Sequence, residues 1–131
     1  MSFTIFLLCI WFLESSCGKN LDHPDGSHGH TGINDITLRD INQRSLSKFR
    51  RQFKIEDLEK KELAFEASRF HIQDYENYSK LYDWDLEDWF LFWRAGAEGM
   101  KHPSEEMKAY ARHGVSCYSQ LMQGVPYWKL K

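Results

Sequence analysis

The sequence contains little that points to catalysis or to a disulfide framework. Its 131 residues include three Cys and three Pro, too few cysteines for the cross-linked scaffold of a small secreted toxin or growth factor. Neither a zinc-protease HExxH motif, a Walker A loop, a GxSxG elbow nor a CxxC pair is present. We therefore predict a protein without enzymatic activity, stabilised mainly by the burial of apolar side chains.

An excess of charge of one sign is also lacking. Lys and Arg number 17 against 19 Asp and Glu, a net charge of −2, which argues against a basic nucleic-acid-binding protein. The range 39–54 nevertheless has six bases and one acid, and the range 74–98 has seven acids and two bases. We expect these two segments to face each other in the fold. Alternatively, Arg44, Lys48 and Arg51, at helical spacing, form a basic ridge that binds a partner.

No apolar run is long enough to span a bilayer as a helix. The longest, Phe3–Leu13, has eleven residues without a charge, which is the length of the apolar region of a secretory signal peptide. Small residues follow it, and cleavage after Gly18 would place Ser16 and Gly18 at the positions where small residues are favoured. Residues 1–18 are therefore predicted to be a signal peptide, and the protein is predicted to be secreted or to reside in the secretory-pathway lumen.

A second interpretation of the same segment depends on Cys17. The string Leu13–Gly18 resembles a bacterial lipoprotein box, although Glu14 replaces the preferred aliphatic residue. This resemblance implies a cell-envelope lipoprotein whose only membrane contact is the lipid on Cys17. Cleavage after Gly18 would leave Cys117 as the one cysteine, whereas cleavage before Cys17 would leave two that are able to pair in an oxidising compartment.

Residues 19–34 are rich in turn-forming Gly, Asp and Pro, lack apolar periodicity and are predicted to form a flexible tether. Three imidazoles lie close together in this segment, at His23, His28 and His30. Imidazole is a ligand of Zn²⁺ and Cu²⁺, so these residues are candidate metal ligands. The alternative is a solvated linker without a bound metal or other cofactor.

Helical periodicity begins after residue 34, and the range 35–131 is predicted to be a single all-α domain of three or four helices. The range 33–95 contains no Pro or Gly, which permits long helices. We predict helices over 37–53, over 55–82, over 84–100 with either an end or a bend at its glycines, and from Pro103 to about residue 123. On the first of these, one apolar face is predicted to contain Leu38, Ile41, Ser45, Phe49 and Phe53.

Aromatic residues make up 15% of the chain, more than a core of this size requires. Trp84, Trp89 and Trp93 are therefore candidates for a partner-binding surface, together with the basic ridge. The leading hypothesis is an exported helical module that binds a protein partner and no nucleic acid. The alternatives are a helical carrier of an apolar small ligand, held by Trp89, Phe90 and Trp93, and a protein whose tether captures a metal.

Overall fold

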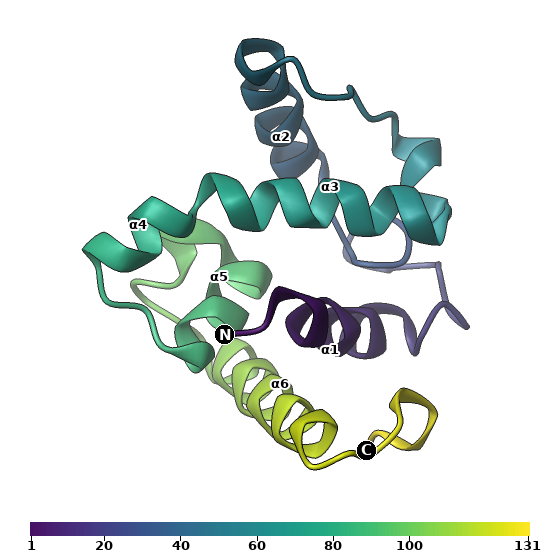
Figure 1. Ribbon diagram of the computed structural model, residues 1–131, viewed down its shortest axis with the longest axis vertical. Helices are drawn as coiled ribbons and strands as arrows, with labels where there is room; N and C mark the ends of the chain where they lie inside the picture. Colours follow the sequence, from purple (N-terminus) through teal and green to yellow (C-terminus); the bar gives the residue numbers. More distant parts are fainter. The chain divides into compact units, whose positions relative to one another are not determined.

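The computed structural model describes all 131 residues and contains helices but no β-strand. This result confirms the predicted all-α class. The number of helices is larger than predicted, because the chain forms six α-helices and two short 3-10 helices (Figure 1). They are α1 (Phe3–Ser15), α2 (Asp35–Lys48), η1 (Ile55–Glu59), α3 (Lys61–Asp74), α4 (Glu76–Leu81), α5 (Leu86–Gly99), α6 (Glu105–Met122) and η2 (Tyr127–Lys129).

The helices belong to two compact units, which divide the chain within α1 and at the start of α4. The first unit comprises Met1–Cys9 and Asn77–Lys131. It therefore contains the beginning of α1 together with α5, α6 and η2. The second unit comprises Ile10–Glu76 and contains the end of α1, α2, η1 and α3.

In the first unit, α5 packs along α6 around a core of aromatic side chains. The helices approach closely at Gly114, where any Cβ would collide with the Phe90 ring. Asp85 begins α5 by a capping box, in which its side chain and that of Asp88 each accept a hydrogen bond from the other's backbone N–H. The predicted bend in this helix is confirmed at Gly96, whose φ of 77° interrupts the helical backbone.

In the second unit, α2 and α3 pack against each other and against the loop that precedes α2. Leu38 and Ile41 are the buried apolar residues of α2, and Ile72 is buried on α3. The buried Ser68 hydroxyl donates a hydrogen bond of 2.8 Å to Thr31 in the loop. Some residues of the predicted tether, such as Thr31, are therefore buried in this unit. The flexibility of the tether stays a prediction.

The single helix predicted over 55–82 is wrong, because the structure divides this range into η1, α3 and α4. The first break is at Lys60, between η1 and α3, and two residues before it the Leu58 carbonyl accepts a hydrogen bond of 3.0 Å from the His30 N–H. A continuous helix would use this carbonyl for Glu62. Gly29 lies so close to the Leu58 backbone that a Cβ would overlap it. The contact with the loop thus replaces a helical hydrogen bond, although the sequence here contains neither Pro nor Gly.

The predicted signal peptide contains α1, whose apolar side chains are buried in both units. In the first unit, Phe6 contacts Phe90 with a ring-centroid distance of 4.6 Å. In the second unit, the Trp11 indole donates a hydrogen bond of 3.0 Å to His30 and meets the Phe65 ring edge-on at 5.7 Å. Cleavage and export of this segment stay predictions.

Candidate functional site

Four large apolar side chains are exposed in the second unit, and all of them lie on α2 or on the segment after it. They are Ile36, Leu46, Phe49 and Ile55, which we call the α2 patch. The extreme member is Phe49, whose accessible surface is 98% of that of a fully exposed residue. Leu46 and Ile55 line one groove, and exposed apolar side chains that form a continuous patch are typical of surfaces that bind a partner.

Local interactions fix the position of α2 within its unit. The helix begins after Asn34, whose side-chain oxygen accepts a hydrogen bond of 2.8 Å from the Thr37 N–H. Its buried face carries Leu38, Ile41 and Ser45. Because this face is committed to the interior, the rest of the helix surface, including Leu46, faces solvent.

The helix ends at Phe49, which adopts a left-handed conformation with φ of 56° and ψ of 33°. Its N–H and that of Arg50 both donate to the Ser45 carbonyl, which closes the last turn. Left-handed backbone is favourable for Gly and unfavourable for a bulky side chain. Sequence analysis places Phe49 on the buried face of this helix, and that prediction is wrong because the helix ends here and the chain reverses.

The segment after Phe49 returns along α2 and is held by Asn42. The Asn42 side-chain amide donates a hydrogen bond of 2.8 Å to the Phe53 carbonyl, and its oxygen accepts one of 2.9 Å from the Phe53 N–H. Gln52 adds a bond of 2.9 Å to the Asn42 carbonyl. A groove of about 420 Å³ lies between helix and return segment. Its lining residues are Asp35, Leu38, Arg39, Asn42, Gln43, Leu46, Gln52 and Ile55.

Basic side chains next to the α2 patch are paired within the second unit. Lys48 and Arg50 contact the two carboxylate oxygens of Asp74, at 2.7 and 2.8 Å, and the Asp74 side chain is completely buried. Burial alone would raise the pKa of Asp74, but the hydrogen bonds and charges of Arg50 and Lys48 outweigh this effect and lower it. The predicted basic ridge is therefore divided among partners: Arg44 pairs with Asp40, and Arg51 pairs with Glu66.

The pairing leaves much of the basic ridge in contact with solvent. The side chains of Arg44, Lys48 and Arg51 are all substantially exposed in their ion pairs. Asp74, at the start of the acidic segment, pairs with Lys48 and Arg50 of the basic one. That the rest of the two segments face each other stays a prediction. The ridge can therefore still present positive charge to a partner that approaches the α2 patch.

The three candidate tryptophans lie together in the first unit and form part of its aromatic cluster. Trp84 and Trp89 meet edge-on with their ring centroids 5.1 Å apart, and Trp93 contacts Phe6 at 6.2 Å. Trp89 is buried, whereas Trp84 and Trp93 are half-buried. A partner-binding role for these residues stays a prediction.

The three histidines of the predicted tether bind different partners. The Nε2 of His23 contacts the Gly29 carbonyl at 2.7 Å, and that of His28 contacts Asp35 at 2.7 Å. His30 accepts the Trp11 bond through Nδ1, so its Nε2 carries the proton and donates to the Glu59 carbonyl at 3.1 Å. No group of three His, Cys, Asp or Glu side chains is placed to hold a metal ion. Metal capture by the tether therefore stays a hypothesis.

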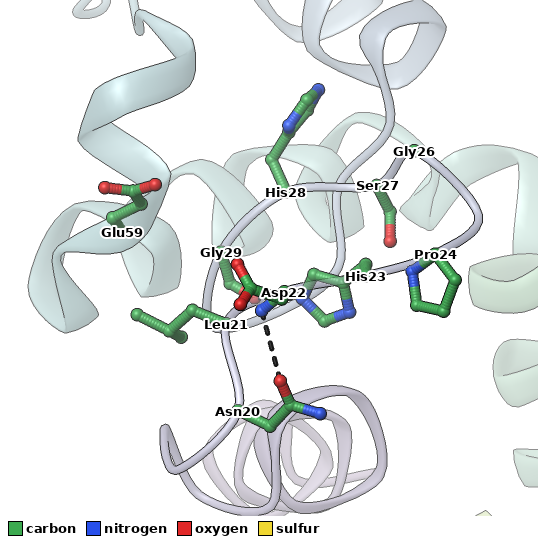
Figure 2. A pocket seen from close by; sticks show the side chains of 10 residues that line it. All are labelled: Asn20, Leu21, Asp22, His23, Pro24, Gly26, Ser27, His28, Gly29 and Glu59. Carbon is green, nitrogen blue, oxygen red and sulfur yellow. Dashed lines mark hydrogen bonds between the residues drawn. The ribbon is translucent and has the colours of Figure 1, made fainter.

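Two of these histidines line a pocket of about 650 Å³ in the second unit, formed by residues 20–24, residues 26–29 and Glu59. Figure 2 shows that the rings of His23 and His28 point to different sides of this loop. Asn20 accepts a hydrogen bond of 3.2 Å from the Asp22 N–H inside the loop. Two hydrogen bonds therefore join lining residues to each other, from the Asp22 N–H to Asn20 and between His23 and the Gly29 carbonyl.

Comparison with protein-family models, with curated proteins and with solved structures finds no match to this chain. No helix combines the length and the apolar character needed to cross a membrane. None of the three cysteines, Cys9, Cys17 and Cys117, forms a disulfide in the structure.

Sequence analysis missed most of the α2 patch. A signal was nevertheless present at Ile36 and Leu46, which do not follow the spacing of Leu38, Ile41 and Ser45 and so fall outside the buried face of a helix. No comparable signal identified Phe49, because its exposure depends on the residue at which the helix ends.

Proposed function

We propose that the protein is an exported helical module that binds a protein partner through the α2 patch, without catalysis and without a cofactor. The observation that carries this proposal is Phe49, which is almost fully exposed and held in a left-handed conformation. Both features are unfavourable in the isolated protein. A side chain that combines them is best explained by a role in binding.

Binding to a partner would bury the Phe49 side chain, which is exposed to water in the free protein. Burial of a Phe side chain in a partner's pocket contributes about 1.5–3 kcal/mol, enough for Phe49 to dominate a small interface. The bonds from Asn42 to the Phe53 backbone hold the neighbouring groove in shape. Less conformational entropy is therefore lost when a partner segment enters it.

The charges around the α2 patch indicate the chemistry of the partner. Arg44, Lys48 and Arg51 keep exposed positive charge near the patch, so the partner is expected to present an apolar pocket with an acidic rim. These cations would mainly accelerate association and select the partner, while Phe49 would supply most of the affinity.

Affinity capture from the compartment that contains the protein tests this proposal. The bait chains are the natural sequence, a Phe49→Ser variant and a Leu81→Ser variant, because Leu81 is another strongly exposed apolar residue but lies in the first unit. We expect a specific protein that the natural chain and Leu81→Ser retain and that Phe49→Ser loses. Equal retention of every captured protein by Phe49→Ser would contradict the proposal.

The export part of the proposal is tested separately. Intact mass and N-terminal sequencing of the protein from its natural compartment distinguish a chain that begins at Lys19, a lipid-modified Cys17 and an uncleaved Met1. A start at Lys19 is expected. An uncleaved chain found in the cytosol would refute export without affecting the binding surface.

A further inference from the structure

The end of the chain differs in charge from the rest of the protein. From Met107 to Lys131 the sequence contains no Asp or Glu, although the whole chain has a net charge of −2. Four basic residues lie in this range, namely Lys108, Arg112, Lys129 and Lys131. The tail that follows α6 therefore carries two lysines and no acidic side chain, whereas Lys108 and Arg112 lie in the first half of the helix.

Hydrogen bonds to α6 hold the tail in place. After the helix ends, the chain turns back, and the Val125 N–H donates to the Gln120 carbonyl at 3.0 Å. The Lys131 N–H donates to the Gln120 side chain at 3.3 Å, and the Lys131 carbonyl contacts the His113 imidazole at 3.0 Å. Leu130 is buried. Figure 1 shows this yellow segment folded back beside the end of α6.

The turn of this tail presents aromatic side chains to solvent. Trp128 is 71% exposed, and it meets Tyr127 edge-on at a centroid distance of 5.0 Å. Met122, at the end of α6, is also strongly exposed. We call Met122, Tyr127, Trp128, Lys129 and Lys131 the C-terminal cap. It combines an apolar tip with basic side chains and has no acidic neighbour in sequence.

We propose that the C-terminal cap docks on an anionic lipid surface. Trp and Tyr are favoured at the boundary between lipid head groups and acyl chains, because their rings are apolar and each carries a polar group. Lys129 and Lys131 are adjacent to these rings and would be attracted to anionic head groups.

The size of the cap favours a lipid surface over a protein partner. A stable protein interface needs about 800 Å² from each side, whereas the cap consists of a short turn and the end of one helix. Insertion of an aromatic side chain next to basic residues requires no such area. This contact would not need a lipid on Cys17, and it lies in a different unit from the α2 patch.

Co-sedimentation of the full chain with vesicles tests the proposal. Two kinds of vesicle are needed, of phosphatidylcholine alone and of phosphatidylcholine mixed with phosphatidylglycerol. We expect binding to the anionic vesicles only, with an affinity that falls as the salt concentration rises. Trp128→Ala should weaken this binding about tenfold. Lys129→Gln together with Lys131→Gln should weaken it about twenty-fivefold, since each basic residue contributes about a factor of five.

A matched control is Tyr82→Ala, which removes an exposed aromatic ring from the same unit beside the acidic Asp83. It should bind vesicles as the natural chain does, and circular dichroism should show that all variants stay helical. Absence of the natural chain from the anionic vesicle pellet would refute the proposal and leave a protein partner as the occupant of the cap. Unchanged binding of the Trp128 and lysine variants would refute it too, because adsorption would then occur elsewhere.

Discussion

Replacing Phe49 by Gly should make the protein more stable while making it a poorer binder. The substitution removes a large apolar side chain, which in a protein core would be strongly destabilising. Here the side chain is 98% exposed, so almost no burial is lost in the free protein. What changes is the backbone, because Phe49 occupies the left-handed region at the end of α2.

The magnitude follows from two opposing effects. A left-handed conformation costs an L-residue about 1–2 kcal/mol, a cost that Gly does not have. Gly in turn loses more conformational entropy on folding, about 0.5–1 kcal/mol. The free energy of unfolding should therefore rise by about 0.5–1 kcal/mol, with a rise of about 2–5 °C in the unfolding temperature.

Urea unfolding followed by circular dichroism measures this difference, and Phe49→Ala is the matched control. Ala retains a Cβ, and therefore retains the left-handed cost, so its stability should stay within about 0.5 kcal/mol of the natural chain. Both variants should lose partner affinity by about thirtyfold or more, the effect typical of a central interface residue. Stability and affinity should thus change in opposite directions for Phe49→Gly.

The reasoning would be refuted by a Phe49→Gly variant that unfolds at a lower urea concentration than the natural chain. That result would mean that Phe49 packs against the protein in solution. Equal stabilisation by Gly and by Ala would also refute it, because the gain would then come from removing an exposed ring and not from relieving the backbone.

Four further substitutions or deletions test the structure. Gly29→Ala should destabilise the protein by more than about 2 kcal/mol in thermal unfolding, because its Cβ would overlap the η1 backbone and its φ is +71°. Asp74→Asn should lower the free energy of unfolding by about 3 kcal/mol, because Arg50 would lose its carboxylate partner. The natural chain should lose stability as the pH falls through the lowered pKa of Asp74, and the variant should lack this pH dependence. Burial lowers the pKa of His71 from 6.5 to about 4. The protein should therefore lose stability as the pH falls from 6.5 to about 4. In the His71→Gln variant, the urea concentration at the unfolding midpoint should change less over this pH range. Removal of residues 1–18 should lower the unfolding temperature sharply, since one buried Phe alone contributes about 3–5 kcal/mol; an unchanged temperature would show that α1 does not pack as described.

Some parts of the fold that local chemistry determines are predictable from the sequence, although the Asn34 side chain that begins α2 was not identified. The acidic residues that begin α5, the Pro and acidic residues around the start of α6 and the weak point at Gly96 act through their own backbone neighbours. The break at Lys60 was not predictable in this way. It depends on a hydrogen bond between the Leu58 carbonyl and His30, a residue far away along the chain, and periodicity contains no information about such a contact.

The candidate site likewise has features that local patterns predict and features that depend on contacts between distant residues. Periodicity correctly placed Leu38, Ile41 and Ser45 on one buried face of α2. The groove could not be predicted, because it depends on the return of residues 50–55 along the helix, which the Asn42 side chain holds. The exposure of Phe49 likewise depends on which residue ends the helix, a boundary that sequence patterns locate only within a few residues.

The first helix has a pattern that satisfies two different requirements at once. A signal peptide needs a short charge-free apolar segment, and a helix buried among other elements needs the same composition. Composition therefore cannot separate the two roles, and a cleaved chain would lose the buried contacts of Phe6 and Trp11.

The contacts that position the two proposed surfaces do not involve this first helix. The α2 patch is positioned by contacts within residues 34–74, and the C-terminal cap is held by contacts within α6 and the tail. These contacts lie outside residues 1–18, so a processed chain that stays folded would carry the same two binding surfaces as the complete chain.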